Sequence, residues 1–563
     1  MQKSIYILTL TLCILVGCNS LKRHKAEPTQ NKSNPDASNF WPAKDPVIDG
    51  IPGISLQKLY RKNKVSQTAH TIVVAVLDTQ IDSNHEDLQG RLWINKKEIP
   101  NNGIDDDHNG YIDDVNGWNF IGKKNGSCLI WGNSECVRIV RKWESYFKDK
   151  NPAQFSDAEK YNFRQYQTAV DYLGSTRKFY QNWNKSLEFG IAVLPAAKEA
   201  IKTVFPNENY TLKDLDSLYS IYKTNDKSFA QRRDDNDRDL GALINYMRSF
   251  MEVGQKTAAD ISSQKTRIDS ILQKNLNLGY NERDFIQNNQ NRLEKGYGNN
   301  TVSASKNNTH NTQVSGIIAA NRNKKTGIQG FSNQIKIMPI SVLLTGDEHD
   351  LDIAMAIYYA VDNGAKVINM SFGKELSLEQ DWVTDAIRYA EKKNVLIIHG
   401  AGNSKMDVDK NPYFPSDYSY SDNTEISSNF INVGATTHTA DSTLVYKSSN
   451  YGRQNVDLFA PGANIYTLTP GNQYAYDSGT SLAAPMVSGT AALIWLYYPN
   501  LSLQEVKQII LDSGVSYDLQ VLIPGGQGKK APFKNLSKSG KVLNVYNAME
   551  TAKQFSSRKN ASN

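Results

Sequence analysis

The sequence has little net charge. Its 563 residues include 64 Lys and Arg against 58 Asp and Glu, so the formal net charge is only +6. Over this length such an excess gives no case for a nucleic-acid partner. Apolar residues make up 39% of the chain and charged residues 22%. These shares exclude a wholly disordered or fibrous protein and suffice for at least one large core.

Long apolar runs are also scarce. The run at residues 5–16 follows Lys3 and precedes small residues. As a helix it would measure about 18 Å at ~1.5 Å per residue, too short for a bilayer core of about 30 Å. We therefore predict that residues 1–17 are a secretory signal. We expect no other stretch of the chain to span a membrane.

The end of this signal, residues 15–18, resembles the bacterial lipobox, in which the cysteine is lipidated. The resemblance implies an exported bacterial lipoprotein of the cell envelope, attached to the outer membrane or cell surface through Cys18. The alternative is an ordinary signal that is cut a little later. Residues 18–40 are polar and lack apolar periodicity, which predicts a flexible tether.

Cysteine is rare, with four in the chain. Cys13 leaves with the predicted signal and Cys18 takes the lipid, which leaves Cys128 and Cys136. In an oxidising compartment these two are expected to form a local disulfide. A metal site would need further ligands nearby, and the sequence offers none. Two free thiols are the alternative.

Three segments carry reactive side chains. An apolar, β-branched run at residues 71–77 ends in Asp78, as expected of a buried parallel strand whose carboxyl end faces a site. His310 opens a helix of small residues. Ser481 opens another, with Pro485 expected in its first turn. Alone, His310 would be read as structural and Ser481 as an N-cap.

Together, the order Asp, His, Ser predicts nucleophilic catalysis. A serine hydroxyl is a poor nucleophile until a base removes its proton, and imidazole is such a base near neutral pH. A buried carboxylate selects the imidazole tautomer and stabilises the imidazolium.

In this order the segments resemble those of the subtilisin-like serine proteases, or subtilases. The matching motifs are residues 76–79, 310–320 and 479–485. Residues 337–343 resemble the strand that leads to the substrate groove, and residues 364–373 the strand that ends at the primary specificity pocket. Residues 394–403 resemble the segment that carries the oxyanion-hole asparagine, here Asn403, and residues 456–462 are a further landmark. The resemblance covers residues 65–122 and 300–515.

The resemblance implies an α/β fold, with three α/β/α layers around a mostly parallel sheet. It also implies a serine endopeptidase that acts on proteins or peptides through an acyl-enzyme. Asp78, His310 and Ser481 would be catalytic, and Asn403 would hold the oxyanion. No cofactor is needed for this chemistry. The alternatives are a catalytically silent peptide-binding protein of the same fold and a hydrolase of esters or small peptides.

Several residues depart from the family pattern or compete for a role. Gln80 and Asn311 stand where the family usually has glycine, and Gln80 would be strained if its φ were positive. His85 reads as structural, and His399 has no assigned role. Four acids follow the groove strand and could favour basic substrates, although a solvated acidic loop is the preferred interpretation: Asp347, Glu348, Asp350 and Asp352.

An acidic loop places oxygen side chains at alternate positions, with Gly110 at the sixth. This pattern is typical of the first part of an EF-hand-like loop and predicts a structural Ca²⁺. Asn116 stands where the last ligand, a Glu, would be expected, so we do not expect a full EF-hand. The alternative is a solvated turn. The expected ligands are Asp105, Asp107, Asn109, the Tyr111 carbonyl, and Asp113 or Asp114.

Asp78 and His310 are much farther apart in the sequence than in the family. The extra part, residues 123–300, is charged and carries apolar residues three and four positions apart, which predicts a helical insertion. It could be a lid, a docking arm or a spacer. The catalytic domain is then expected at residues 41–122 and 301–555, with an ordered lead-in at its start and a tail at residues 556–563.

Overall fold

A computed structural model describes residues 40–62, 70–255, 257–304, 310–324, 326–343, 345–420 and 422–562. The predicted signal, Cys18 and nearly all of the predicted tether lie outside this part of the chain. The chain divides into two compact units, one of residues up to 130 together with residues 282–563, the other of residues 131–281. The second unit is shorter than the expected insertion, because residues 123–130 and 282–300 belong to the first unit.

The first unit is built on a nine-stranded sheet of the described residues, in the order β12-β15-β9-β8-β5-β4-β1-β3-β2. All neighbouring strands pair parallel except β12 and β15. The strand bounds are β1 Ile72–Asp78, β2 Trp118–Asn119, β3 Ile335–Ser341, β4 Val367–Met370, β5 Leu396–Gly400, β8 Phe430–Thr436, β9 Leu458–Pro461, β12 Val515–Ser516 and β15 Lys541–Val542.

The sheet is covered on both faces. Along β1, Val74 and Val76 belong to one buried cluster, and Ala75 and Leu77 to another. Successive side chains of a strand point to opposite faces, so each cluster lies on one face of the sheet. This is why β1 reads as a continuous apolar run. The predicted α/β fold with three layers is confirmed.

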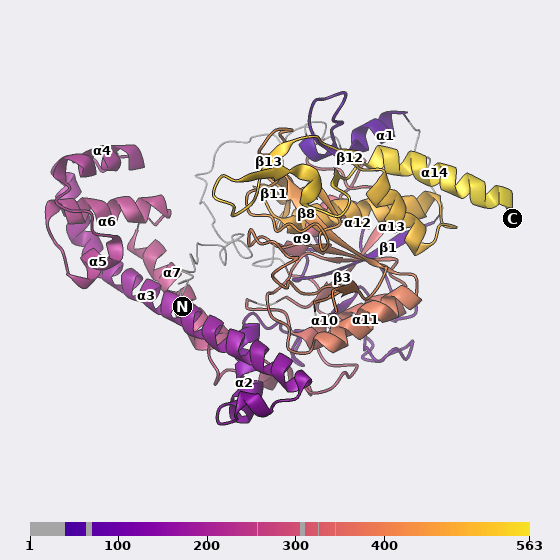
Figure 1. The fold of residues 1–563 in the computed structure, drawn as a ribbon, viewed down its shortest axis with the longest axis horizontal. Helices are drawn as coiled ribbons and strands as arrows, with labels where there is room; N and C mark the ends of the chain where they lie inside the picture. Colours follow the sequence, from indigo (N-terminus) through magenta and orange to yellow (C-terminus); the bar gives the residue numbers. More distant parts are fainter. Residues whose placement is uncertain are drawn as a thin grey trace. The chain divides into compact units, whose positions relative to one another are not determined.

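Helices form the two outer layers (Figure 1). The first cluster includes residues of α1 Leu56–Lys62, α9 His310–Ala319, α12 Thr480–Tyr497, α13 Leu503–Asp512 and α14 Val545–Ser562. The second includes residues of α10 Asp350–Asp362 and α11 Gln380–Lys392. The expected lead-in packs on the core through Leu56 and Leu59. The expected tail is largely helical, since α14 runs to Ser562.

By length and composition, one helix of the described residues could cross a membrane, contrary to our expectation. This helix is α12, but 89% of it is buried inside the protein. Small residues let it approach its neighbours closely. A Cβ on Gly489 would collide with the ring of Phe331. Its apolar character is therefore that of a core helix.

Short elements complete the first unit. They are η4 Trp41–Ala43, α8 Arg283–Ile286, η7 Phe533–Asn535 and the hairpin strands β6 Tyr418–Ser419, β7 Thr424–Glu425, β10 Ile465–Thr469, β11 Gln473–Asp477, β13 Gln520–Leu522 and β14 Lys530–Pro532.

The second unit is helical, as predicted for the insertion. Its described elements are α2 Glu135–Phe147, η5 Pro152–Gln154, α3 Asp157–Lys202, α4 Leu212–Tyr222, α5 Phe229–Asp234, α6 Leu240–Glu252, α7 Ala258–Ser270 and the π-helical turn η6 Ile271–Asn275. The long helix α3 packs against α2, α6 and α7. It begins with a capping box in which Ser156 and Glu159 satisfy each other's main-chain N–H groups.

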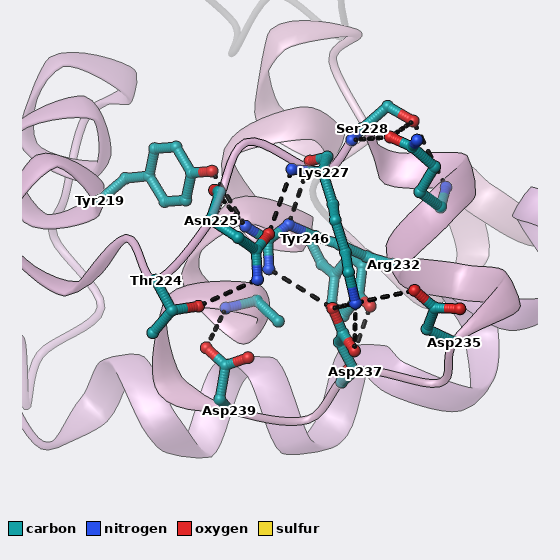
Figure 2. Close-up of polar contacts among 12 residues, drawn as sticks. Tyr219, Thr224, Asn225, Lys227, Ser228, Arg232, Asp235, Asp237, Asp239 and Tyr246 are labelled. Carbon is teal, nitrogen blue, oxygen red and sulfur yellow. Dashed lines mark hydrogen bonds and ion pairs between the residues drawn. The ribbon is translucent and has the colours of Figure 1, made fainter.

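A buried arginine organises one end of this unit (Figure 2). Arg232 is fully buried, and its guanidinium donates to the carbonyls of Lys227 and Asn225 at 3.2 and 3.0 Å and to the Tyr219 hydroxyl at 3.2 Å. Asp237 lies 3.7 Å from the same guanidinium. These bonds tie Arg232 to the connection between α4 and α5, and Asp237 compensates the buried charge.

The expected disulfide is not formed between Cys128 and Cys136, both of which the structure describes. The Cys128 thiol instead donates to the Leu129 carbonyl at 3.3 Å. Burial raises the pKa of this thiol to about 11. Cys136 belongs to α2, in the other compact unit. The prediction was wrong because proximity in sequence did not bring the two cysteines into one unit.

Candidate active site

Asp78 ends β1 and is fully buried. His310 opens α9, and its Nδ1 lies 2.7 Å from Oδ2 and 2.9 Å from Oδ1 of Asp78. The Thr79 main-chain N–H also donates to Asp78 Oδ1 at 2.6 Å. The carboxylate therefore holds the imidazole through Nδ1, and Nε2 is the ring nitrogen that Asp78 does not contact.

The two departures from the family pattern are accommodated without strain, because neither Gln80 nor Asn311 has a positive φ. The Asn311 side chain donates to the Thr79 carbonyl at 2.8 Å, and its main-chain N–H donates to the Thr79 hydroxyl at 3.2 Å. The Gln80 side chain donates to the Thr301 carbonyl at 2.8 Å. Asn311 therefore ties the segment after Asp78 directly to the helix of His310.

Ser481 is the second residue of α12, and the N-cap is Gly479. The ordinary interpretation of Ser481 as an N-cap therefore does not apply. Pro485 is the sixth residue of the helix, not part of its first turn as expected. A proline there cannot donate to the carbonyl four residues earlier. The Ser371 hydroxyl makes up the loss by donating to the Ser481 carbonyl at 2.8 Å.

Asn403 follows β5 and faces the same space as Ser481. Its Oδ1 accepts from the Thr480 main-chain N–H at 2.9 Å, which directs Nδ2 away from that contact. A Cβ built on Gly479 would lie 3.0 Å from Ser481 Oγ and 3.3 Å from Asn403 Nδ2. The bare glycine thus leaves open a space that a hydroxyl and an amide donor border together.

The electrostatics of His310 favour a base. Burial lowers its pKa, whereas the charge and hydrogen bond of Asp78 raise it, with smaller contributions from Asp477 and Glu348. The resulting pKa lies above its ordinary value. Gln313 lies one turn along α9 from His310. Its side chain donates to the Asp477 carboxylate at 3.0 Å and so positions it.

The other histidines have structural surroundings. His85 Nε2 lies 3.2 Å from the Gln473 carbonyl, and the ring packs edge-on against Tyr474. His399 is fully buried and 2.7 Å from the Phe372 carbonyl. Burial lowers the pKa of His399 to about 4, so it is neutral at pH 7.

Two of the four acids after the groove strand are buried in ion pairs. Asp350 lies 2.8 Å from Lys374 Nζ. Asp352 accepts from the Arg283 guanidinium at 2.9 Å. For these two, the interpretation as a solvated acidic loop was wrong, because partners far along the chain neutralise them.

The acidic loop brings only part of the predicted ligand set together. Oxygens of Glu98, Asp105 and Asp107 lie within 4.8 Å of one another. The Asp113 carboxylate instead accepts from the Asn102 and Gly103 main-chain N–H groups at 3.1 and 2.9 Å.

Asp114 also lies outside that acidic group. Its carboxylate accepts from Tyr359 at 2.6 Å and from Asn95 at 2.9 Å. Burial raises the pKa of Asp114 to about 6. The Asn109 carboxamide oxygen accepts from the Tyr111 main-chain N–H at 2.8 Å. Glu98, which precedes the alternating pattern, gave no signal in the sequence.

Comparison with known protein families identifies the family of this chain. The profile of the subtilase family matches residues 69–541. The chain therefore belongs to the subtilase family.

Individual relatives cover smaller parts. The chain is 38% identical over 188 residues to the thermophilic serine proteinase of Bacillus sp. (strain AK1), covering 33% of this chain and 42% of that one. It is 34% identical over 202 residues to the cell wall-associated protease of Bacillus subtilis (strain 168), covering 36% and 20%. It thus spans less than half the length of either relative. A solved protease of Pseudoalteromonas arctica PAMC 21717 is 27% identical, with 43% of this chain and 70% of that one covered and a TM-score of 0.35.

Proposed function

We propose that the protein is a serine endopeptidase in which Asp78, His310 and Ser481 form the catalytic triad. The observation that carries this proposal is the contact of His310 Nδ1 with the fully buried Asp78 carboxylate at 2.7 Å. It is supported by the open space over Gly479 that Ser481 and Asn403 border. Membership of the subtilase family supports the same chemistry.

In this proposal Ser481 Oγ attacks a peptide carbonyl carbon as its proton moves to His310 Nε2. Asp78 holds Nδ1–H and stabilises the imidazolium. Asn403 Nδ2 and the Ser481 main-chain N–H hold the oxyanion, and that N–H lacks a helical acceptor because it lies in the first turn of α12. Collapse gives the proton to the leaving amine and leaves an acyl-enzyme. Water then attacks the acyl carbon as its proton moves to His310 Nε2, and the bond to Ser481 Oγ breaks as that proton passes to Oγ and the new carboxylic acid leaves.

Fluorophosphonate labelling of the chain from residue 19, read by intact mass, tests this chemistry. We expect one adduct on the wild type and none on the Ser481→Ala variant. A folded wild type that takes no adduct would favour the catalytically silent, peptide-binding alternative. Comparing casein with short chromogenic peptides then separates an endopeptidase from a hydrolase of small substrates.

We further propose that the protein is exported and anchored to the cell envelope through a lipid on Cys18, at the outer membrane or the cell surface. The support is the sequence of residues 1–18, which lie outside the described part of the chain. Metabolic labelling with a palmitate analogue should mark the wild type and leave a Cys18→Ala variant unmarked. Equal label on both proteins would exclude lipidation at Cys18.

We also propose a structural Ca²⁺ held by Glu98, Asp105 and Asp107. Glu98 is 6% exposed, and its Oε2 is buried without a hydrogen-bond partner. A buried carboxylate oxygen needs a partner, and carboxylate oxygens are the ligands that Ca²⁺ prefers. The ion would stabilise the loop and take no part in the chemistry.

The calcium proposal predicts that EDTA lowers the melting temperature and that added Ca²⁺ restores it. Glu98→Gln should abolish this response. The matched control is Asp113→Asn, which changes an acid of the same loop outside the group and should keep it. An unchanged melting temperature of the wild type in EDTA would contradict the proposal.

A further inference from the structure

Two glycines border the Thr480–Ser481 corner where the proposed reaction takes place. Gly373 lies two residues beyond Ser371, whose hydroxyl donates to the Ser481 carbonyl at 2.8 Å. The Gly402 main-chain N–H donates to the Thr480 hydroxyl at 3.0 Å. The chain ends of β4 and β5 therefore meet beside the nucleophile.

A substrate side chain would have to be accommodated near this meeting point. In the proposed reaction the attacked carbonyl lies between Ser481 Oγ and Asn403 Nδ2. The side chain of the same substrate residue starts only one or two covalent bonds away, within about 3 Å. Gly402 directly precedes Asn403, so that side chain would enter the space between Gly373 and Gly402.

The ring of Tyr413 already occupies this space. A Cβ built on Gly373 would lie 2.8 Å from the Tyr413 Cζ atom, and one built on Gly402 would lie 2.6 Å from the same atom. Both distances are far below the 3.5–4.0 Å or so of ordinary carbon contacts. One aromatic ring therefore contacts both main chains and takes the room that side chains at the two glycines would need.

Tyr413 is held firmly in this place. Its neighbour Phe414 exchanges two main-chain hydrogen bonds with Lys374, at 2.8 and 2.9 Å. Lys374 in turn forms a buried ion pair with Asp350 at 2.8 Å. The ring also packs on a small apolar cluster that includes Val408. These main-chain bonds anchor the segment that carries the ring.

We infer that Tyr413 is a specificity-determining residue that restricts cleavage to peptide bonds following small residues such as Gly, Ala or Ser. The inference rests on the proposed serine chemistry at Ser481. Protein interiors are close-packed, so a Phe or Leu side chain cannot share the space with the tyrosine ring. A Gly residue brings no side chain into this space, and Ala or Ser brings only one or two heavy atoms.

A series of peptides that differ only at the residue before the scissile bond tests this inference. For the wild type we expect kcat/KM to be about a hundredfold higher after Ala than after Phe, a discrimination of the size that side-chain exclusion produces. In Tyr413→Ala the ratio of Phe to Ala cleavage should rise at least tenfold. In Tyr413→Phe, which keeps the ring, the ratio should stay that of the wild type.

Tyr420→Ala is the matched control, because the Tyr420 hydroxyl accepts from the Tyr413 main-chain N–H at 3.4 Å and so supports the same loop. This variant loosens the loop but leaves the Tyr413 ring in place, so its ratio of Phe to Ala cleavage should not rise. A wild type that cleaves after Phe as readily as after Ala would overturn the inference without any variant. Fluorophosphonate titration counts the active sites of the wild type and of each variant. Labelled enzyme without a size preference would overturn this inference alone, whereas unlabelled Ser481 would overturn the serine chemistry with it.

Discussion

The Ser371 hydroxyl replaces a hydrogen bond that Pro485 removes from the helix of the nucleophile, and this predicts a measurable coupling. Ser371 donates to the Ser481 carbonyl at 2.8 Å and accepts from the Asn369 side chain at 2.9 Å. Both Ser371 and Asn369 are buried. The perturbation is Ser371→Ala, alone and combined with Pro485→Ala.

The magnitude follows from counting the groups left without a partner. Ser371→Ala orphans the Ser481 carbonyl and the Asn369 Nδ2 donor, and each orphan costs about 1–3 kcal/mol. In Pro485→Ala the new main-chain N–H at position 485 can donate to the Ser481 carbonyl. Ser371→Ala then orphans only Asn369. We expect its cost to fall by about 1–3 kcal/mol, which is the coupling free energy of the pair.

The assay is urea unfolding of the four proteins in a Ser481→Ala background, where self-digestion is absent and the main-chain carbonyl is retained. The free energies of unfolding form a double-mutant cycle. In the active background, Ser371→Ala should also lower kcat for a short peptide more than Ser371→Ala with Pro485→Ala does. Additive effects, with a coupling below about 0.5 kcal/mol, would refute the reasoning that the hydroxyl replaces the missing N–H.

Three further predictions concern the proposed catalytic groups. Asp477→Asn removes a charge that raises the pKa of His310. Because His310 then stays neutral to lower pH, the acidic limb of the kcat/KM profile should move to lower pH. An upward shift of this limb, or no shift, would count against this role. Asn403→Ala should lower kcat about a hundredfold or more with KM nearly unchanged, the general magnitude for one oxyanion donor; a loss mainly in KM would instead indicate substrate binding. Asn311→Gly removes the bond to the Thr79 carbonyl at 2.8 Å and should lower kcat severalfold at unchanged KM, whereas an unaltered kcat would show that this bond does not position His310.

Local patterns in the sequence predicted the framework correctly, because each pattern reports the environment of its own segment. The continuous apolar run that ends at Asp78 is the central strand β1, buried on both faces. Ser502 and Glu505, three residues apart in the sequence, form the capping box that opens α13. Small residues around His310 and Ser481 did indicate two helices that pack closely on their neighbours. Periodicity in the extra segment indicated helices.

Only the tertiary structure decided how distant segments complete one another. Glu98 joins Asp105 and Asp107, although it precedes the alternating pattern of the loop. Cys128 and Cys136 are close in sequence but belong to different compact units.

The surroundings of the nucleophile depended on the tertiary structure in the same way. Pro485 sits well inside a helix because Ser371, from another strand end, supplies the missing donor. Tyr413 fills a space walled by two glycines that follow separate strands. A local pattern encodes which way a segment faces, whereas satisfaction of buried polar groups and filling of space depend on neighbours that only folding brings together.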